Sequence, residues 1–113
     1  MNDPRLTEFV LLFNERHFFE AHEVLENLWL ESHGDDRTFY KGLIQLAVAF
    51  AHLQRRNFRG GKQVYLRAIG FLSPYAPVYQ DINLSRLLEE CHPFFADSES
   101  QDVLSLKTPT IGL

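Results

Sequence analysis

Residues 14–29 (NERHFFEAHEVLENLW) place acidic and histidine side chains among large apolar residues. On a helix, at about 100° per residue, one apolar face is formed by Phe18, Ala21, Val24, Leu25, Leu28 and Trp29. His22 lies at the margin of this face, and Glu26 follows one turn later on the same margin. Glu23 and Glu20 lie progressively farther from the buried edge. Side chains that can transfer protons or bind cations therefore line one edge of the helix.

The first chemical interpretation of these residues is a metal site. His22 and Glu26 are spaced i, i+4 with Glu23 between them, and His52 from a later helix would add a second imidazole. Nitrogen and oxygen ligands of this kind suit Zn, Mn or Fe. The pentapeptide HEVLE is similar to the H-E-x-x-H pattern of metalloproteases, with Glu26 in place of the second histidine. This interpretation predicts a divalent metal held by His22, Glu26 and His52, in a metal-dependent hydrolase or related enzyme.

The second interpretation is acid–base catalysis without a metal. Carboxylates crowded in a partly dry groove raise one another's pKa, and a neighbouring imidazole can then transfer the proton. The catalytic residues under this interpretation are Glu23, His22, Glu26, His52 and Gln45. Covalent catalysis is not expected, because the candidate nucleophiles lie outside the segment; they are Ser32, Ser73 and Cys91.

The third interpretation is structural. Both histidines would hydrogen-bond to Glu23, Glu26 and Gln45, which satisfies buried polar groups and fixes the register of two helices. The protein would then be a helical protein-interaction module, with a homodimer among its assemblies. Against this, one or two polar groups are enough to fix register, and this chain uses at least five. Trp29 and the phenylalanines are assigned to the core, and the three interpretations stay open.

Helical spacing and punctuation residues predict five helices. The first covers residues 4–15, after a cap at Asn2 or Asp3, and the second covers 18–32 and ends at Gly34 as a left-handed C-cap. The third covers 37–56, with Asp35 and Asp36 as its caps. The fourth covers 58–72, and a loop at 74–81 precedes the fifth, which starts at 81 or 83 and ends near 95. The predicted fold is an all-α, mainly antiparallel bundle.

The third predicted helix is apolar almost all round, which is typical of a helix surrounded by others. Its polar stripe consists of Lys41, Gln45, His52 and Arg56, with the small residues Gly42 and Ala49 beside it. Small residues allow a neighbouring helix to come close. We therefore expect this stripe to face the second helix, which would bring Gln45 and His52 against His22, Glu23 and Glu26.

Composition limits the classes of function. The 113 residues, 45% of them hydrophobic, predict one domain over residues 1–96 and an extended or poorly ordered tail over 97–113. The net charge of −4 argues against nucleic acid as a partner, and the local basic residues 55, 56, 59 and 62 are interpreted as a solvated helix end. The single cysteine and the absence of a membrane-length apolar run predict a soluble, cytoplasmic protein. The partner we expect is a small molecule or a protein.

Two stretches resemble a known family. FNERHFFEAHEVLENLW (13–29) and FYKGLIQLAVAFAHLQRRNFRGG (39–61) are similar to the bacterial and archaeal family called domain of unknown function 309, through the motifs EAHE-x-LE-x-x-W and GLIQ-x-A-x-A-x-x-H. The resemblance implies a small all-helical protein and carries no established activity. It implies that the motif positions are Glu20, His22, Glu23, Glu26, Trp29, Gly42, Gln45, His52 and Asn57.

Overall fold

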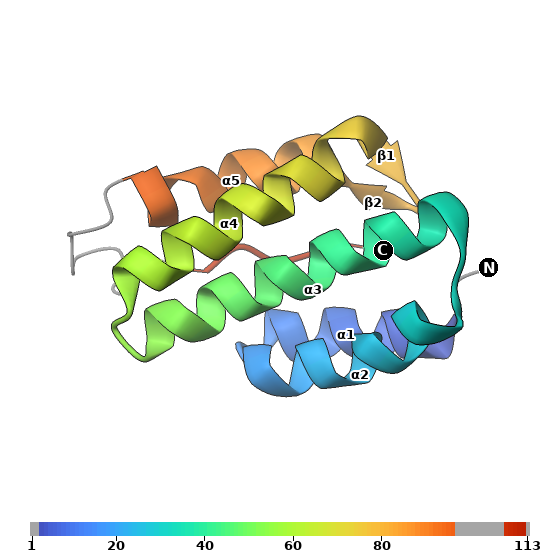
Figure 1. Ribbon diagram of the computed structural model, residues 1–113, viewed down its shortest axis with the longest axis horizontal. Coiled ribbons are helices and arrows are strands. Elements are labelled where there is room, and N and C mark those ends of the chain that lie inside the picture. The colour runs from blue at the N-terminus through green and yellow to red at the C-terminus, as the bar shows by residue number, and fades with distance from the viewer. Residues whose placement is uncertain (1–2, 97–107, 113) are drawn as a thin grey trace.

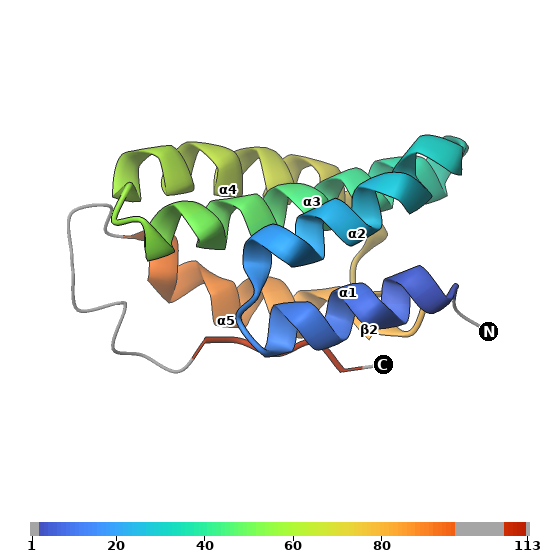
Figure 2. The same ribbon diagram turned by 90° about the horizontal axis from the view of Figure 1, so that it is seen from below.

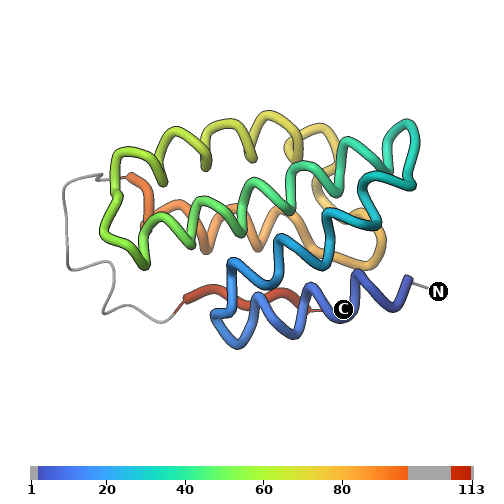
Figure 3. The backbone as a smooth tube through the Cα atoms, turned by 60° about the horizontal axis from the view of Figure 1, so that its bottom comes forward, coloured from blue at the N-terminus to red at the C-terminus, as the bar shows by residue number. Residues whose placement is uncertain are grey.

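The computed structural model describes residues 3–96 and 108–112 of the chain. Its elements are α1 (Pro4–Asn14), α2 (Phe18–Glu31), α3 (Gly34–Gln54), α4 (Phe58–Leu72), a 3-10 turn (Ser73–Tyr75), β1 (Val78–Tyr79), β2 (Ile82–Asn83) and α5 (Leu84–Ala96). Each helix runs antiparallel to the one before it (Figure 3). The predicted all-α bundle is therefore confirmed, with five α-helices in the described part of the chain.

The helices form two layers around a common core. One layer contains α4, α3 and α2 side by side, and the other contains α5 and α1, with residues 108–112 between them (Figures 1 and 2). Because α3 lies in the middle of the first layer, it is covered on several sides. Its ten buried residues are Phe39, Tyr40, Gly42, Leu43, Ile44, Leu46, Ala47, Ala49, Phe50 and Leu53. The prediction that other helices surround this apolar segment is therefore confirmed.

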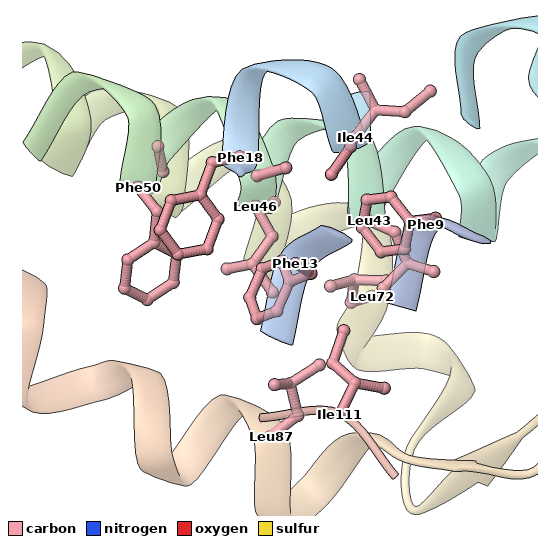
Figure 4. Packing of buried hydrophobic residues seen from close by; sticks show 14 of the residues in the cluster. Phe9, Phe13, Phe18, Leu43, Ile44, Leu46, Phe50, Leu72, Leu87 and Ile111 are labelled. Carbon is pink, nitrogen blue, oxygen red and sulfur yellow. The ribbon is translucent and has the colours of Figure 1, made fainter. Parts of the chain in front are cut away.

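A chain of aromatic rings connects the two layers (Figure 4). Phe50 of α3 stacks on Phe18 of α2, with ring centroids 5.0 Å apart, and meets Phe95 of α5 edge-on at 5.1 Å. Phe13 of α1 meets Phe18 edge-on at 5.0 Å, and Tyr65 of α4 stacks on Phe95 at 4.2 Å. All five helices therefore share one continuous aromatic core, which sets the position of α2 against α3.

The boundary between α2 and α3 differs from the prediction. α2 ends at Glu31, and α3 begins at Gly34, three residues earlier than expected. Gly34 does have the predicted left-handed backbone (φ +61°), but it is the first residue of α3 and not the cap of α2. Asp35 and Asp36 lie inside the first turn, where carboxylates favour the positive end of the helix dipole.

The small residues of α3 contact α4, and the expectation that they let α2 approach is wrong. A Cβ placed on Gly42 would lie 2.5 Å from the side chain of Leu72 in α4. A Cβ on Gly61 of α4 would lie 3.1 Å from the carbonyl oxygen of Ala49. The small residues thus let α3 and α4 approach each other closely. α2 packs on the other side of α3 through larger side chains.

The predicted loop at 74–81 contains a short β-hairpin. Val78 pairs with Asn83, and Tyr79 pairs with Ile82 in an antiparallel register. Gln80 and Asp81 at the turn both have positive φ, 48° and 66°, as a two-residue hairpin turn with the twist of type I′ requires. The Asn-Gly or Asp-Gly signal of such turns is missing here, so periodicity alone did not reveal the hairpin.

The hairpin is fixed to the start of α3 by side-chain hydrogen bonds. The hydroxyl of Tyr79 donates to Asp36 at 2.6 Å, and the amide of Gln80 donates to the same oxygen at 2.9 Å. The hydroxyl of Tyr75 donates to Asp35 at 3.1 Å. The two aspartates predicted as helix caps thus serve as acceptors for a segment 40 residues or more away in sequence.

Residues 108–112 lie along the bundle between α1 and α5 (Figure 2). Ile111 is buried, and its backbone N–H and C=O both bond to the side-chain amide of Asn14. The predicted tail covers residues 97–113, of which 97–107 and 113 lie outside the described residues. The part that is described has neither helix nor strand and packs on the core.

Candidate functional site

His22 lies at the edge of α2 with its side chain 19% exposed. Its Nδ1 is 2.6 Å from the carbonyl oxygen of Phe19 in the preceding turn. Because a carbonyl oxygen only accepts, the hydrogen bond assigns the proton of the neutral ring to Nδ1. Nε2 then keeps its lone pair and faces Glu26, whose Oε2 is 3.6 Å away. His22 therefore presents an acceptor atom outward.

His52 on α3 has the opposite polarity. Its Nδ1 lies 3.2 Å from Nδ2 of Asn57, while Oδ1 of Asn57 accepts the backbone N–H of Gly60 at 3.1 Å. The Gly60 bond fixes which way the Asn57 amide points, since only the oxygen can accept. Nδ1 of His52 is therefore the acceptor of an amide N–H. The proton of the neutral His52 ring is on Nε2, which acts as a donor.

The two histidines line one pocket between α2 and α3. The pocket has a volume of about 160 Å³ and is lined by Phe19, His22, Val48, Ala51, His52 and Arg55. Phe19 is 47% exposed, and the guanidinium of Arg55 lies 5.8 Å from its ring centroid. An apolar floor thus carries two imidazole rings and one positive charge.

The predicted carboxylates lie on the other side of His22. A second hollow is lined by Phe19, His22, Glu23, Glu26 and Asn27, and both glutamates are exposed. His22 and Phe19 line both hollows, whereas Glu26 and His52 share neither. In residues 3–96 and 108–112 no three His, Cys, Asp or Glu side chains gather closely enough to hold one metal ion. The structure thus pairs His22 with Glu26, and His22 with His52, separately.

Gln45 and Trp29 lie farther along the same pair of helices. Gln45 is half-buried and lines neither hollow. The ring of Trp29 is half-buried against the core, with Arg37 at 4.4 Å and Lys41 at 4.6 Å from its centroid. Lys41 therefore faces α2, as the predicted stripe requires, but it contacts an aromatic ring and no carboxylate of the cluster. Glu20 is exposed, and its Oε2 lies 3.7 Å from Nδ1 of His17.

The hydrogen-bond network of the structural interpretation is not formed among the described residues. His22 bonds within its own helix, and His52 bonds to Asn57 beyond the end of α3. No hydrogen bond in the described part of the chain joins either histidine to Glu23, Glu26 or Gln45. The register of α2 on α3 is set by apolar packing instead.

Four of the six residues that line the pocket were not predicted as site residues, namely Phe19, Val48, Ala51 and Arg55. Phe19 was assigned to the core, and Arg55 to a solvated helix end. A signal for Phe19 does exist, because Phe18 and Phe19 are adjacent and a helix turns about 100° between them, so only one can face the core. Phe18 is 1% exposed, and Phe19 points outward.

The candidate nucleophiles have other roles. Ser32 Oγ donates to the carbonyl of Leu28 at 2.6 Å, and Ser73 Oγ donates to the carbonyl of Ile69 at 2.7 Å. Cys91 is buried in α5, and this burial raises the pKa of its thiol well above the usual range. A thiol that stays protonated is a poor nucleophile.

The fold and the α2–α3 pocket define the class of protein as an all-α bundle with histidines between two of its helices. Comparison with known proteins gives the family. The chain belongs to the family described as domain of unknown function 309 (DUF309), whose model matches residues 6–64. The match covers α1 to α3 and the start of α4, so it includes every residue of the α2–α3 pocket. The resemblance found in the sequence is thereby confirmed.

Two bacterial relatives are similar to parts of the chain. The uncharacterized protein YpuF of Bacillus subtilis (strain 168) is 39% identical over 77 residues, which cover 66% of this chain and 44% of that protein. An uncharacterized protein of Aquifex aeolicus (strain VF5) is 29% identical over 83 residues, covering 73% of this chain and 25% of that protein. The chain thus spans less than half the length of these relatives. Within the described residues, no helix has the length and apolarity needed to cross a membrane.

Proposed function

We propose that this chain is a helical binding module and that the α2–α3 pocket is its contact site. One observation carries the proposal: His22 and His52 come from different helices and line the same pocket, yet the hydrogen bond described above for each ring does not join α2 to α3. Polar side chains that do not join α2 to α3 can bind a ligand without weakening the packing of these helices, so they are suited to recognition. The exposed Phe19 beside them supports the same conclusion.

The chemistry of the pocket defines the ligand. Val48, Ala51 and the Phe19 ring offer an apolar contact, and an aromatic residue next to an arginine is a frequent energetic centre of protein interfaces. Nε2 of His52 donates a hydrogen bond, and Nε2 of His22, at the border with the hollow that contains Glu26, accepts one. The ligand we propose is a protein segment, or a small molecule, that presents a donor and an acceptor beside an apolar group.

A photo-crosslinking experiment tests this proposal. Phe19 is replaced by benzoyl-phenylalanine in the chain expressed in its native host, and Leu66 of α4, also exposed, is replaced in a matched control. We expect a discrete crosslinked product from position 19 that is absent at position 66. The product should weaken when His52→Ala or Arg55→Ala is added. Equal products at both positions, or products indifferent to His52→Ala, would show that the pocket is not the contact site.

Metal-dependent hydrolysis is the second candidate. It is favoured by the His22 ring, whose Nδ1 bond to a backbone carbonyl orients Nε2 as metal-binding histidines are oriented, next to Glu26 Oε2. His52 would complete a ligand set of His22, Glu26 and His52 only if its proton moved from Nε2 to Nδ1. That shift requires the Asn57 amide to turn or to release His52.

Thermal unfolding with added Zn, Mn or Fe(II) tests the metal. A ligand that binds only the folded state stabilises by about 2.7 kcal/mol at a hundredfold excess over its Kd. That corresponds to roughly ten degrees for a domain of this size. The shift should shrink on acidification, because imidazole must be neutral to bind. No shift for the wild type, or an undiminished shift in a His22→Ala/His52→Ala variant, would rule out this site.

We place the protein in a reducing, cytoplasmic setting as part of the same proposal. Its single cysteine is a buried free thiol, which fits a compartment without disulfides. The partner we propose is a protein or a small molecule, and a second copy of the chain is one such protein. The net charge of −4 does not favour nucleic acid.

A further inference from the structure

A single side chain holds the backbone of the C-terminal segment. Nδ2 of Asn14 donates to the carbonyl of Ile111 at 2.9 Å, and Oδ1 of Asn14 accepts the N–H of Ile111 at 2.7 Å. Two residues exchange both backbone bonds in this way in an antiparallel sheet. Here an asparagine side chain replaces the neighbouring strand. The contact recognises extended backbone and is independent of the side chain that the backbone carries.

The Ile111 side chain supplies the anchor for this contact. It is 4% exposed and lies in the core beside Leu87 (Figure 4). Pro109 is also buried, whereas Thr110 and Gly112 are exposed. The segment therefore binds through alternate side chains, as an extended peptide does in a groove.

Two hollows lie beside this segment, both between it and the side formed by α5 and the hairpin. A cavity of about 270 Å³ lies beside residues 110–112, against Ile82 and Leu87. Another of about 400 Å³ lies beside residues 108–110, against Pro93 and Phe94. Arg86 lines both of these spaces. A segment with larger side chains on either side of the anchor would fill this space and bury more apolar surface than residues 108–112 do.

We infer that the α1–α5 groove is a binding site for an extended peptide segment of a partner protein, and that residues 108–112 occupy it as an internal ligand. The partner segment carries an aliphatic residue at the position of Ile111, with its backbone held by Asn14. Every contact of Ile111 can be made by a segment of another chain, because none depends on the covalent connection. This groove is separate from the α2–α3 pocket, and the inference does not rest on the proposed function.

A peptide-binding measurement on the full chain tests the inference. The probe is a fluorescein-labelled peptide with the sequence of residues 108–112, TPTIG, amidated at its C-terminus. In the full-length Ile111→Asp variant the internal segment loses its anchor, so we expect the probe to bind. In the wild type the internal segment competes at high effective concentration, so binding should be at least about tenfold weaker. Fluorescence anisotropy gives both affinities.

Matched variants separate recognition from general loosening. Adding Asn14→Ala to Ile111→Asp should abolish binding of the probe, whereas adding Gln63→Ala, at an exposed position of α4, should leave it unchanged. A peptide with aspartate in place of isoleucine should not bind. If circular dichroism shows that Ile111→Asp unfolds the bundle, Ile111→Ala takes its place.

Two results would overturn the inference. They are a folded Ile111 variant that does not bind the probe, and binding that survives Asn14→Ala. Either would mean that the segment is only a part of the core. A wild-type dimer at high concentration that Asn14→Ala disperses would support the site, with the segment of a second copy as its occupant.

Discussion

Nδ2 of Asn57 lies 3.2 Å from Nδ1 of His52, and this contact decides which nitrogen of His52 carries the proton. Asn57 is also the N-cap of α4, where its Oδ1 accepts the N–H of Gly60. One amide thus fixes the start of a helix and the hydrogen-bonding character of a residue in the candidate site. The two roles can be separated by substitution.

We predict that Asn57→Asp keeps the cap and reverses the polarity of His52. Aspartate caps helices about as well as asparagine, but it can only accept, so the proton of His52 should move to Nδ1. Nitrogen NMR of the His52 ring reports the tautomer. Asn57→Ala should instead lower the free energy of unfolding by about 1 kcal/mol through loss of the cap. An unchanged tautomer in Asn57→Asp would contradict the assignment.

We predict that His22→Ala has little effect on stability. Among residues 3–96 and 108–112 this ring has one hydrogen bond, to the carbonyl of Phe19 in its own helix, and the ring lies at the edge of the core. The free energy of unfolding should change by less than about 0.5 kcal/mol, as for other substitutions away from the core. Urea denaturation measures this difference. A loss of 1–3 kcal/mol, the cost of an unsatisfied buried group, would return His22 to a structural role.

Two glycines in neighbouring helices should respond in opposite directions to alanine. Gly42→Ala places a Cβ 2.5 Å from the fully buried Leu72 side chain, so α3 and α4 must shift. Nothing lies within 4 Å of a Cβ on Gly70, which is exposed in α4. We expect Gly70→Ala to stabilise by up to about 1 kcal/mol through helix propensity. Gly42→Ala should destabilise by about 1 kcal/mol, because overpacking exceeds that gain. Thermal unfolding of both variants measures the difference.

Alkaline pH should weaken the attachment of the hairpin to α3. The hydrogen bond to the Asp36 carboxylate, together with partial burial, raises the pKa of the Tyr79 phenol above its ordinary value. Stability from this contact is therefore complete below pH about 10, where the unfolded phenol is still protonated, and is lost as the pH rises further.

Denaturation of the wild type and of Tyr79→Phe from pH 8 to pH 11 checks this prediction. The wild type should have the larger free energy of unfolding at pH 8. The difference in free energy of unfolding between the two proteins should become smaller toward pH 11. The two proteins differ only in the hydroxyl at position 79, so the change in this difference with pH reports that hydroxyl and its neighbours Asp36 and Tyr75. A difference in free energy of unfolding that does not change with pH would contradict the prediction.

The helices could be predicted because their signals are local. Apolar spacing and the Ser73-Pro74 stop placed α4 at residues 58–72, the bounds found in the structure. Helix ends that depend on distant partners were missed. The first turn of α3, which starts at Gly34, is bonded through its aspartates to Tyr75, Tyr79 and Gln80, and no sequence pattern reveals contacts 40 residues or more apart.

The candidate site was predictable in residue type but not in arrangement. Periodicity places His22 and His52 on the facing sides of α2 and α3, and both line the pocket. Periodicity gives directions and not side-chain orientations, so it could not show that His22 bonds to its own helix, or that Asn57 binds His52. Pairing Gln45 with the cluster needed the offset between the helices, which depends on the aromatic packing around Phe50.

The Asn14–Ile111 contact also affects the order in which the protein folds. It joins residues 97 positions apart, so forming it closes almost the whole chain into a ring and carries a larger loop-closure entropy than any helix hairpin here. Contacts of such separation form late and slow the final step. Hydrogen exchange should therefore find the Ile111 amide opening by local detachment while the amides of α3 open only with global unfolding. The first helix acquires its last neighbour only when the rest of the bundle is already built.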